Sequence, residues 1–245
     1  MAVKTYLFDC DNTLVLSEEL AFEGCADLLN EICAAKGVSP PPSFTGGKLI
    51  TEFVGQNFRG MLASLQQRYG FPLAADEADG YVVREEDVVI ARLRSGLAPC
   101  VGVETQLKRL QQAPERPTLA VVSSSALRRL RASLETVGFD RFFAADQVYS
   151  AATSLPTPTS KPDPAVYLHA LEQLGAQAAS SVAVEDSRSG TLSAVRAGIP
   201  VIGYVGPYPA DRQDSMAAVL REAGARVVIR HWDEFPQAVA EIEAA

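Results

Sequence analysis

Histidine is scarce in this sequence. Only His169 and His231 occur among 245 residues, which excludes a metal site built from several histidines. The four cysteines also lack the CxxC spacing of zinc and redox motifs; they are Cys10, Cys25, Cys33 and Cys100. We interpret them as buried apolar residues in a reducing compartment and expect the protein to be cytoplasmic.

An excess of positive charge is missing as well. The chain has 22 Lys and Arg against 30 Asp and Glu, a formal net charge of -8. Without a basic cluster to neutralise phosphates in series, we expect neither nucleic acid nor a membrane surface as a partner. No apolar run approaches the roughly 18 residues of a membrane span, and no basic-then-apolar signal segment opens the sequence.

What the chain does have is an ordinary globular composition, with 47% hydrophobic and 21% charged residues. Short apolar segments alternate with helical patterns in its second part. The predicted strands are 5–8, 119–122, 181–184, 201–204 and 227–229, with Phe142-Phe143 as a further short strand. The predicted helices are 126–137, 164–174, 189–197, 211–223 and 233–243. This alternation predicts an α/β fold with a Rossmann-like parallel sheet core and helices on both faces.

Residues 15–96 do not show this alternation of strands and helices. A helix is predicted over 16–36, with Ser17 as its N-cap, and a helical pattern continues over 49–97 with breaks at 70–72 and 79–80. No strand is evident there. We therefore predict an inserted all-helical domain at 15–96 and an α/β core domain formed by 1–14 and 97–245.

The first predicted strand ends in an unusual acidic turn. Thr5–Phe8 is apolar and aromatic, and Asp9 and Asp11 follow directly, with Asn12 and Thr13 behind them. Neighbouring carboxylates at the end of a buried strand repel each other and are costly to desolvate, unless a cation or a catalytic role accounts for them. The alternative is an Asx-type turn that caps the next helix.

Three later segments carry polar groups of a similar kind. Ser123-Ser124-Ser125 ends one strand with hydroxyls that suit an anion, or that serve only as a helix N-cap. Lys161 precedes Pro162 and Pro164, which restrain the backbone at the start of a helix. This position favours contact with an anion, although a lone lysine is often a solvated surface charge. Glu185 and Asp186 follow the strand at 181–184.

Two strands that end in acids predict a hard, oxygen-ligated cation such as Mg²⁺, because histidine ligands are not available. The hydroxyls and the lysine would hold phosphoryl oxygens, one carboxylate would act as a nucleophile, and a second would perform acid–base work. These are the groups that phosphoryl transfer requires.

At this point the chain resembles a known family. Phe8–Val15, Val122-Ser123, Ser160-Lys161-Pro162 and Val184–Ser187 resemble, in order and spacing, the four motifs of the haloacid dehalogenase-like hydrolases. Ala194–Gly203 is similar to the helix–strand stretch that follows the fourth motif in that family. The resemblance extends over the whole chain.

The resemblance implies a role for each motif residue. Asp9 would be the nucleophile that forms an aspartyl-phosphate, and Asp11 would protonate the leaving group and then activate water. Thr13 and Ser123 would hold phosphoryl oxygens, while Lys161 would steady Asp9 and the phosphate. Mg²⁺ would be the cofactor; its ligands would be Asp9, the backbone carbonyl of Asp11, and Asp186, with Glu185 nearby.

Further predictions concern the neighbours of these residues. Asn12 and Ser124 are expected to contribute to substrate binding. Asn12 stands where the family usually has Gly, and Asn tolerates a left-handed turn. The arginines Arg128, Arg129 and Arg131 are expected to form the exposed face of a helix.

The insert resembles the small helical cap of the subfamily that contains phosphoglycolate phosphatase, β-phosphoglucomutase and the sugar-phosphate phosphatases. Substrate choice would then lie in the cap, where Gly55–Arg59, Glu18 and Glu19 are candidates for lining the site. We expect Arg59 or Gln56 to contact the organic part of a small phosphorylated metabolite. The alternative for Arg59 is a solvated helix charge.

The intact Asp11 favours hydrolysis of a phosphate monoester (of a sugar, a polyol or glycolate), because relatives that cleave other bonds lack an acid at that position. A β-phosphoglucomutase-like mutase is the alternative, but Leu20-Ala21-Phe22 has no counterpart of the mutase histidine. An inactive binding module would have lost a motif residue, and none is lost. We expect a monomer or a small homo-oligomer.

Overall fold

The computed structural model describes residues 2–53 and 56–245 and divides into two compact units. The first comprises Met1–Leu16 and Ala98–Ala245, and the second Ser17–Leu97. The boundaries predicted from the sequence, 14/15 and 96/97, differ from these by two residues and one residue. Among the described residues, no helix combines the length and apolar character needed to cross a bilayer.

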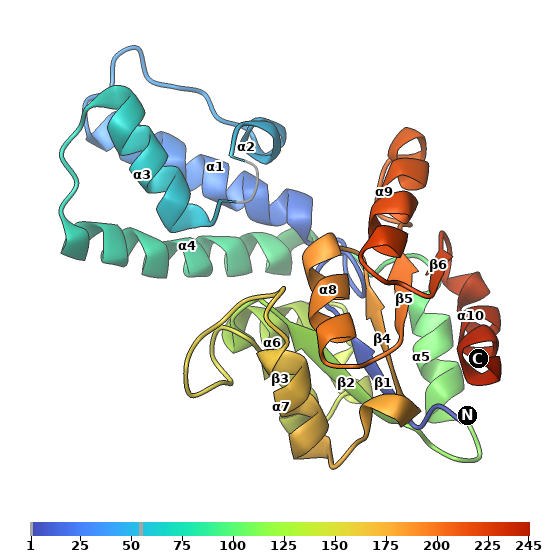
Figure 1. The fold of residues 1–245 in the computed structure, drawn as a ribbon. Coiled ribbons are helices and arrows are strands. Elements are labelled where there is room, and N and C mark those ends of the chain that lie inside the picture. The colour runs from blue at the N-terminus through green and yellow to red at the C-terminus, as the bar shows by residue number, and fades with distance from the viewer. Residues whose placement is uncertain (1, 54–55) are drawn as a thin grey trace. The chain divides into compact units, whose positions relative to one another are not determined.

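A parallel sheet of six strands lies at the centre of the first unit, as far as it is described (Figure 1). The strand order is β3-β2-β1-β4-β5-β6, and every pairing is parallel. The strands are β1 Thr5–Phe8, β2 Thr118–Ser123, β3 Val148–Ser150, β4 Ser181–Glu185, β5 Val201–Tyr204 and β6 Val227–Ile229. The predicted α/β class with a parallel sheet is confirmed.

Helices cover both faces of this sheet, because successive side chains of a strand point to opposite sides. The ring centroids of Tyr6 and Phe8 lie 5.8 and 6.3 Å from that of Phe235 on one face. Leu7 belongs to a buried cluster on the other face with residues of α7, α8 and α9. The helices of this unit are α5 Val103–Gln111, α6 Leu127–Thr136, α7 Ala165–Leu174, α8 Arg188–Arg196, α9 Ala210–Glu222 and α10 Phe235–Ala244.

The second unit is helical throughout its described residues. Its helices are α1 Glu18–Ala35, α2 Gly46–Glu52, α3 Phe58–Tyr69 and α4 Ala75–Gly96. Their buried core includes Leu28, Leu29, Ile32, Leu49, Leu62, Leu65, Val89 and Leu93. Ser17 occupies the predicted N-cap position of α1, but its side chain makes no capping hydrogen bond.

Two local predictions are wrong. The break predicted at 79–80 does not occur, because α4 runs without interruption through Gly80; its apolar stripe packs on α1 and outweighs the low helix propensity of one glycine. Phe142-Phe143 is not a strand. Asp140–Phe142 forms a short 3₁₀ helix, and both rings are buried in the core without any strand pairing. The strand in this region is β3, six residues further on, at Val148–Ser150.

The register of the sheet determines where the polar strand ends meet. Phe8 of β1 pairs with Val121 of β2 and with Val184 of β4. The residues that follow Phe8, Val121 and Val184 therefore lie together at the C-terminal ends of these three strands. From β1 the chain proceeds outward to β2 and β3 on one side and to β4, β5 and β6 on the other. Such a switch in strand order is where open α/β sheets bind their ligands.

Candidate active site

A tight turn presents the carboxylates that follow β1. The carbonyl oxygen of Cys10 accepts hydrogen bonds from the backbone N–H groups of Leu14 and Val15, at 2.9 and 3.1 Å. Asn12 has a φ of 56°, the only positive φ of a non-glycine residue in the described chain. Asn is among the few residues that adopt this conformation readily, so it fits the place where the family usually has Gly. The turn leaves Asp9 buried and Asp11 partly exposed.

Lys161 connects the members of a buried ion network. Its Nζ donates to Oδ1 of Asp9 at 2.6 Å, to Oε1 of Glu185 at 2.6 Å and to the carbonyl oxygen of Val122 at 2.7 Å. These bonds use all three donors of an ammonium group. Burial alone would lower the pKa of Lys161, but the charges of Asp9 and Glu185 outweigh it, so the pKa is raised and the side chain stays charged. The backbone N–H of Lys161 donates to Oγ of Ser124 at 3.1 Å.

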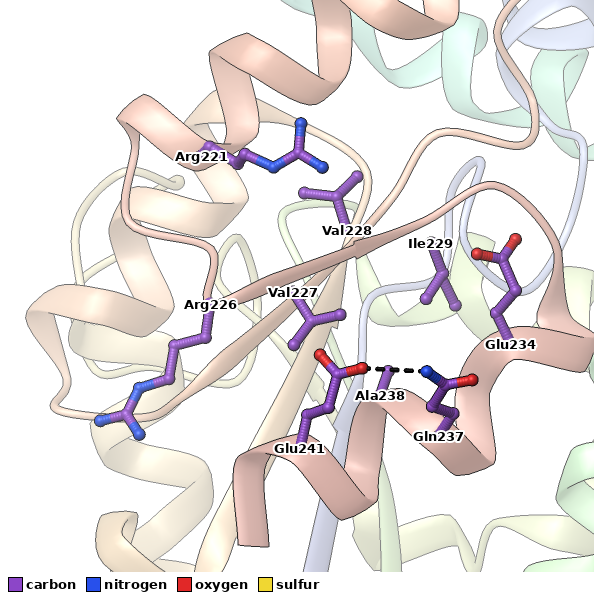
Figure 2. A pocket seen from close by; sticks show the side chains of 9 residues that line it. All are labelled: Arg221, Arg226, Val227, Val228, Ile229, Glu234, Gln237, Ala238 and Glu241. Atoms are coloured by element: carbon purple, nitrogen blue, oxygen red, sulfur yellow. Dashed lines mark hydrogen bonds between the residues drawn. The ribbon is translucent and has the colours of Figure 1, made fainter. Parts of the chain in front are cut away.

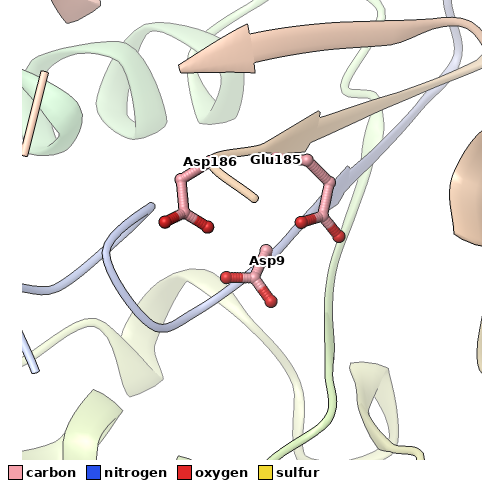
Figure 3. A group of neighbouring side chains, drawn as sticks. All are labelled: Asp9, Glu185 and Asp186. Carbon is pink, nitrogen blue, oxygen red and sulfur yellow. The ribbon is translucent and has the colours of Figure 1, made fainter. Parts of the chain in front are cut away.

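Three acids form a cluster, which Figure 3 shows. One oxygen each of Asp9, Glu185 and Asp186 lies within 4.8 Å of the others, and all three residues are buried. Burial, together with the charges of Glu185 and Asp11, raises the pKa of Asp9 to about 7, although Lys161 opposes the shift. When all three are ionised, these carboxylates carry more negative charge than the single ammonium group of Lys161 balances.

These residues fit a hard divalent cation. Carboxylate oxygens are the ligands that Mg²⁺ prefers, and a cation would offset the surplus charge. In addition, Oε2 of Glu185 is buried and has no hydrogen-bond partner among the described residues. A Cβ at Gly190 would lie only 1.7 Å from this oxygen, so the carboxylate fills the space that the glycine leaves beside α8.

Tyr167 completes the network and was not identified from the sequence. Its hydroxyl donates to Oε1 of Glu185 at 2.5 Å, and its ring centroid lies 5.3 Å from Nζ of Lys161. Burial and the charge of Glu185 raise the pKa of Tyr167 well above its usual value, so the hydroxyl remains a donor. In the sequence this tyrosine is one more residue on the apolar face of α7, and nothing local distinguishes it.

Asp11 has its own pair of donors. Oγ of Ser125 donates to Oδ2 at 2.6 Å, and Nη2 of Arg129 lies 3.4 Å from Oδ1. The expectation that all three arginines of α6 form its exposed face is thus wrong for Arg129, which turns toward the acidic turn after β1. Arg128 and Arg131 are exposed, as expected.

The two predicted phosphoryl-binding hydroxyls are buried. Oγ1 of Thr13 has no hydrogen-bond partner among the described residues. An unsatisfied buried hydroxyl costs about 1–3 kcal/mol, and a bound anion would remove that penalty. Oγ of Ser123 accepts the backbone N–H of Ser125 at 3.1 Å. The predicted site residues Asp9, Ser123 and Glu185 thus lie at the C-terminal ends of β1, β2 and β4, respectively.

The predicted cap residues belong to the second unit. Arg59 forms an exposed ion pair with Asp79, and Oε1 of Gln56 accepts a hydrogen bond from Oγ of Ser64 at 2.9 Å. Gly55 lies outside the described residues. Glu18 and Glu19 form the first turn of α1. The contact of Arg59 or Gln56 with a substrate stays a prediction.

A separate cavity of about 320 Å³ runs along the edge strand β6 (Figure 2). Its lining includes Glu234 and Glu241, but both carboxylates have structural partners. Glu234 accepts the backbone N–H groups of Arg230 and His231 at 3.0 and 2.8 Å, and Glu241 accepts from Gln237 at 3.2 Å. None of the residues of the acid cluster lines this cavity.

Known proteins resemble this chain along its length. The phosphoglycolate phosphatase of Caulobacter vibrioides is 30% identical over 237 residues, which is 96% of this chain and 90% of the relative. The 6-phosphogluconate phosphatase of Escherichia coli is 25% identical over 202 residues, 82% of each chain. A conserved haloacid dehalogenase-like protein from Agrobacterium tumefaciens has a similar structure, with a TM-score of 0.74, 30% identity, and coverage of 99% of this chain and 100% of the other.

The family itself is identified over a continuous stretch. The model of the haloacid dehalogenase-like hydrolases matches residues 3–198, which include Asp9, Ser123, Lys161 and Asp186. A match over most of the chain, together with the parallel sheet and the acid cluster at its switch point, leads to one conclusion. This protein belongs to the haloacid dehalogenase-like hydrolases.

Proposed function

We propose that this protein is a Mg²⁺-dependent phosphatase that hydrolyses a small phosphorylated metabolite through an aspartyl-phosphate intermediate. The observation that carries the proposal is the position of Asp9. It is buried, it is held by Lys161 at 2.6 Å, and it shares a cluster with two further acids. A carboxylate fixed in this way is oriented for attack at a single place, which is the condition for nucleophilic catalysis.

In the first step, a carboxylate oxygen of Asp9 attacks phosphorus, and the bond between phosphorus and the ester oxygen breaks. The departing oxygen takes a proton from Asp11, so a neutral alcohol leaves. Thr13 and Ser123 donate to the phosphoryl oxygens. Lys161 keeps Asp9 in place and balances part of the developing charge.

In the second step, water attacks the phosphorus of the aspartyl-phosphate, and Asp11, now a carboxylate, accepts its proton. The acyl phosphate bond breaks, inorganic phosphate is released and Asp9 is regenerated. One residue can thus serve as acid and then as base, because Asp11 lost its proton in the first step.

Mg²⁺ would be held by Asp9, Asp186 and the backbone carbonyl of Asp11, with Glu185 as a further candidate ligand. When bound, the ion supplies charge that offsets the repulsion between the carboxylates and the phosphoryl group and polarises the latter. The unpartnered Oε2 of Glu185 and the grouping of three buried carboxylates both support a cation at this position.

The relatives favour a short phosphorylated acid or sugar as the substrate. One is a phosphoglycolate phosphatase and another a 6-phosphogluconate phosphatase by name. We therefore expect a phosphate monoester of glycolate, a sugar acid, a sugar or a polyol. Each of these esters has an alcohol as its leaving group, whose oxygen Asp11 would protonate.

Phosphate release from such a panel, with Mg²⁺ and with excess EDTA, tests the proposal. Wild-type protein should release phosphate only with the metal, and Asp9→Asn should reduce kcat by at least about a thousandfold, since the nucleophile is lost. Asp140→Asn, which alters an exposed carboxylate of the same unit, serves as the control and should leave the rate unchanged. Equal rates in Asp9→Asn and wild type would refute the assigned nucleophile.

A further inference from the structure

Arg129 lies on the open side of the acidic site. Its side chain is 21% exposed and that of Asp11 is 26% exposed, whereas the side chains of Asp9, Lys161 and Glu185 are 9%, 4% and 0% exposed. The pair of Arg129 and Asp11 therefore borders the buried ion network on the side that solvent and ligands can reach.

The proposed reaction determines which part of a substrate comes near this pair. Asp11 must contact the ester oxygen to protonate it, and the ester oxygen is bonded to the first carbon of the leaving alcohol. A substituent on that carbon lies only two bonds from the oxygen. Because Nη2 of Arg129 is 3.4 Å from Oδ1 of Asp11, the substituent is within reach of the guanidinium.

Charge then restricts what the substituent can be. Asp9, Asp11, Glu185 and Asp186 make the site strongly acidic, and the charge of Lys161 is already shared between two buried carboxylates. A leaving alcohol that carries a carboxylate would be repelled unless a cation faced it. Arg129 supplies a cation at that position, and a guanidinium matches a carboxylate through two parallel N–H···O bonds.

Of the two contacts of Asp11 described above, the one with Arg129 is the longer. Its length of 3.4 Å exceeds the 2.7–2.9 Å typical of a charge-assisted hydrogen bond, while Ser125 holds Asp11 at 2.6 Å. Asp11 would thus keep a firm donor when the guanidinium also donates to a substrate carboxylate.

We propose that Arg129 is the specificity-determining residue of the site and binds a carboxylate next to the phosphorylated carbon. The preferred substrates would then be phosphate esters of short 2-hydroxy acids. This inference rests on the proposed phosphatase function and narrows its substrate class. The competing role for Arg129 is only to orient Asp11, and that role would affect every substrate equally.

Two matched substrates separate these roles: phosphoglycolate and its carboxyl methyl ester, which has the same phosphate and leaving oxygen but no carboxylate charge. For Arg129→Gln we expect kcat/KM to fall by about 10–100-fold more for the acid than for the ester, in line with the loss of a hydrogen bond between charged groups. Arg129→Lys should retain part of the preference. Arg131→Gln changes an exposed arginine on the same helix and should retain all of it.

Affinity gives a second readout that does not depend on turnover. In an Asp9→Asn background, which prevents chemistry, Arg129→Gln should weaken binding of phosphoglycolate by a larger factor than binding of the methyl ester. Equal losses for both substrates, in rate and in affinity, would overturn the inference and leave the phosphatase function intact. Absence of phosphate release from either substrate by the wild type, with turnover of other panel members, would also overturn it. Absence of release from every ester would refute the proposed function itself.

Discussion

Glu185 is buried among several potential partners, yet both hydrogen bonds described for it end on one oxygen. Oε1 accepts from Lys161 at 2.6 Å and from Tyr167 at 2.5 Å, while Oε2 rests against Gly190. The two donors approach from different elements, the loop before α7 and α7 itself. Together they restrict rotation of the carboxylate, and through Lys161 they determine where Asp9 lies.

We predict that Tyr167→Phe lowers kcat by about tenfold. The substitution removes only the hydroxyl, and a hydrogen bond to a charged group contributes about 1.5–3 kcal/mol. Without it, the carboxylate of Glu185 can rotate and Lys161 is held less firmly against Asp9. Steady-state kinetics with a saturating phosphate ester would measure the effect.

Tyr149→Phe is the matched control for this experiment. It removes the hydroxyl of another buried tyrosine, on β3, where the ring packs edge-on against His169 with centroids 5.8 Å apart. Both variants should lose thermal stability to a similar extent, because each loses the hydroxyl of a buried tyrosine. The kcat effect should be confined to Tyr167→Phe, and an equal decrease in both would contradict the positioning role.

Site residues can be predicted from the sequence where their chemistry is unusual for their position. Acids at the end of a buried strand and a lysine in a proline-restrained stretch before a helix are such cases, and the structure brings Asp9, Lys161 and Glu185 into one network. Tyr167 and Arg129 could not be predicted in the same way. A tyrosine on an apolar helix face and an arginine among arginines are common, and only the tertiary neighbours reveal their partners.

Among the elements, α4 offers a direct test of helix propensity. Gly80 lies inside this helix, and an added Cβ would meet no atom within 4 Å. We predict that Gly80→Ala stabilises the protein by about 0.5–1 kcal/mol, because alanine restricts the unfolded chain and favours the helix. Urea denaturation followed by circular dichroism would measure the change.

Gly70, at the C-terminal end of α3, provides the opposite case. It also has open space around it, but its φ of 69° is left-handed. Gly70→Ala should therefore destabilise by about 1–2 kcal/mol, since an L side chain is strained in that conformation. Equal effects of the two substitutions would mean that backbone conformation does not decide their sign.

Periodic side-chain patterns and local backbone preferences explain which elements could be predicted from the sequence. Apolar strands and amphipathic helices of the α/β unit repeat a pattern that predicts their type, and β1, β2, β4, β5 and β6 all lie where expected. Gly80 was misleading because tertiary packing on α1 outweighs a local preference of about 1 kcal/mol. Phe142-Phe143 was misleading because two apolar residues are too few to reveal a period.

For the molecule as a whole, the surplus of acids at the switch point of the sheet couples stability to pH and metal. The pKa of Asp9 is raised to about 7 from an ordinary value of 3.8, so between those pH values the folded state binds more protons than the unfolded state. Stability contributed by this group is therefore present at low pH and is lost as pH rises from about 4 to about 7.

Because Mg²⁺ requires deprotonated carboxylates, it should stabilise the protein more at pH 8 than at pH 5. At a metal concentration of about 100 times Kd, binding contributes about 2.7 kcal/mol, which corresponds to an increase in Tm of several degrees for a chain of this size. Thermal unfolding at both pH values, with Mg²⁺ and with EDTA, would measure the difference. Asp9→Asn cannot titrate at this position, so its metal-dependent shift should be smaller and should vary less with pH. If Mg²⁺ raised the Tm of wild type equally at pH 5 and pH 8, the acids of the cluster would not be its ligands. Groups of the protein itself would then have to balance the negative charge of the cluster.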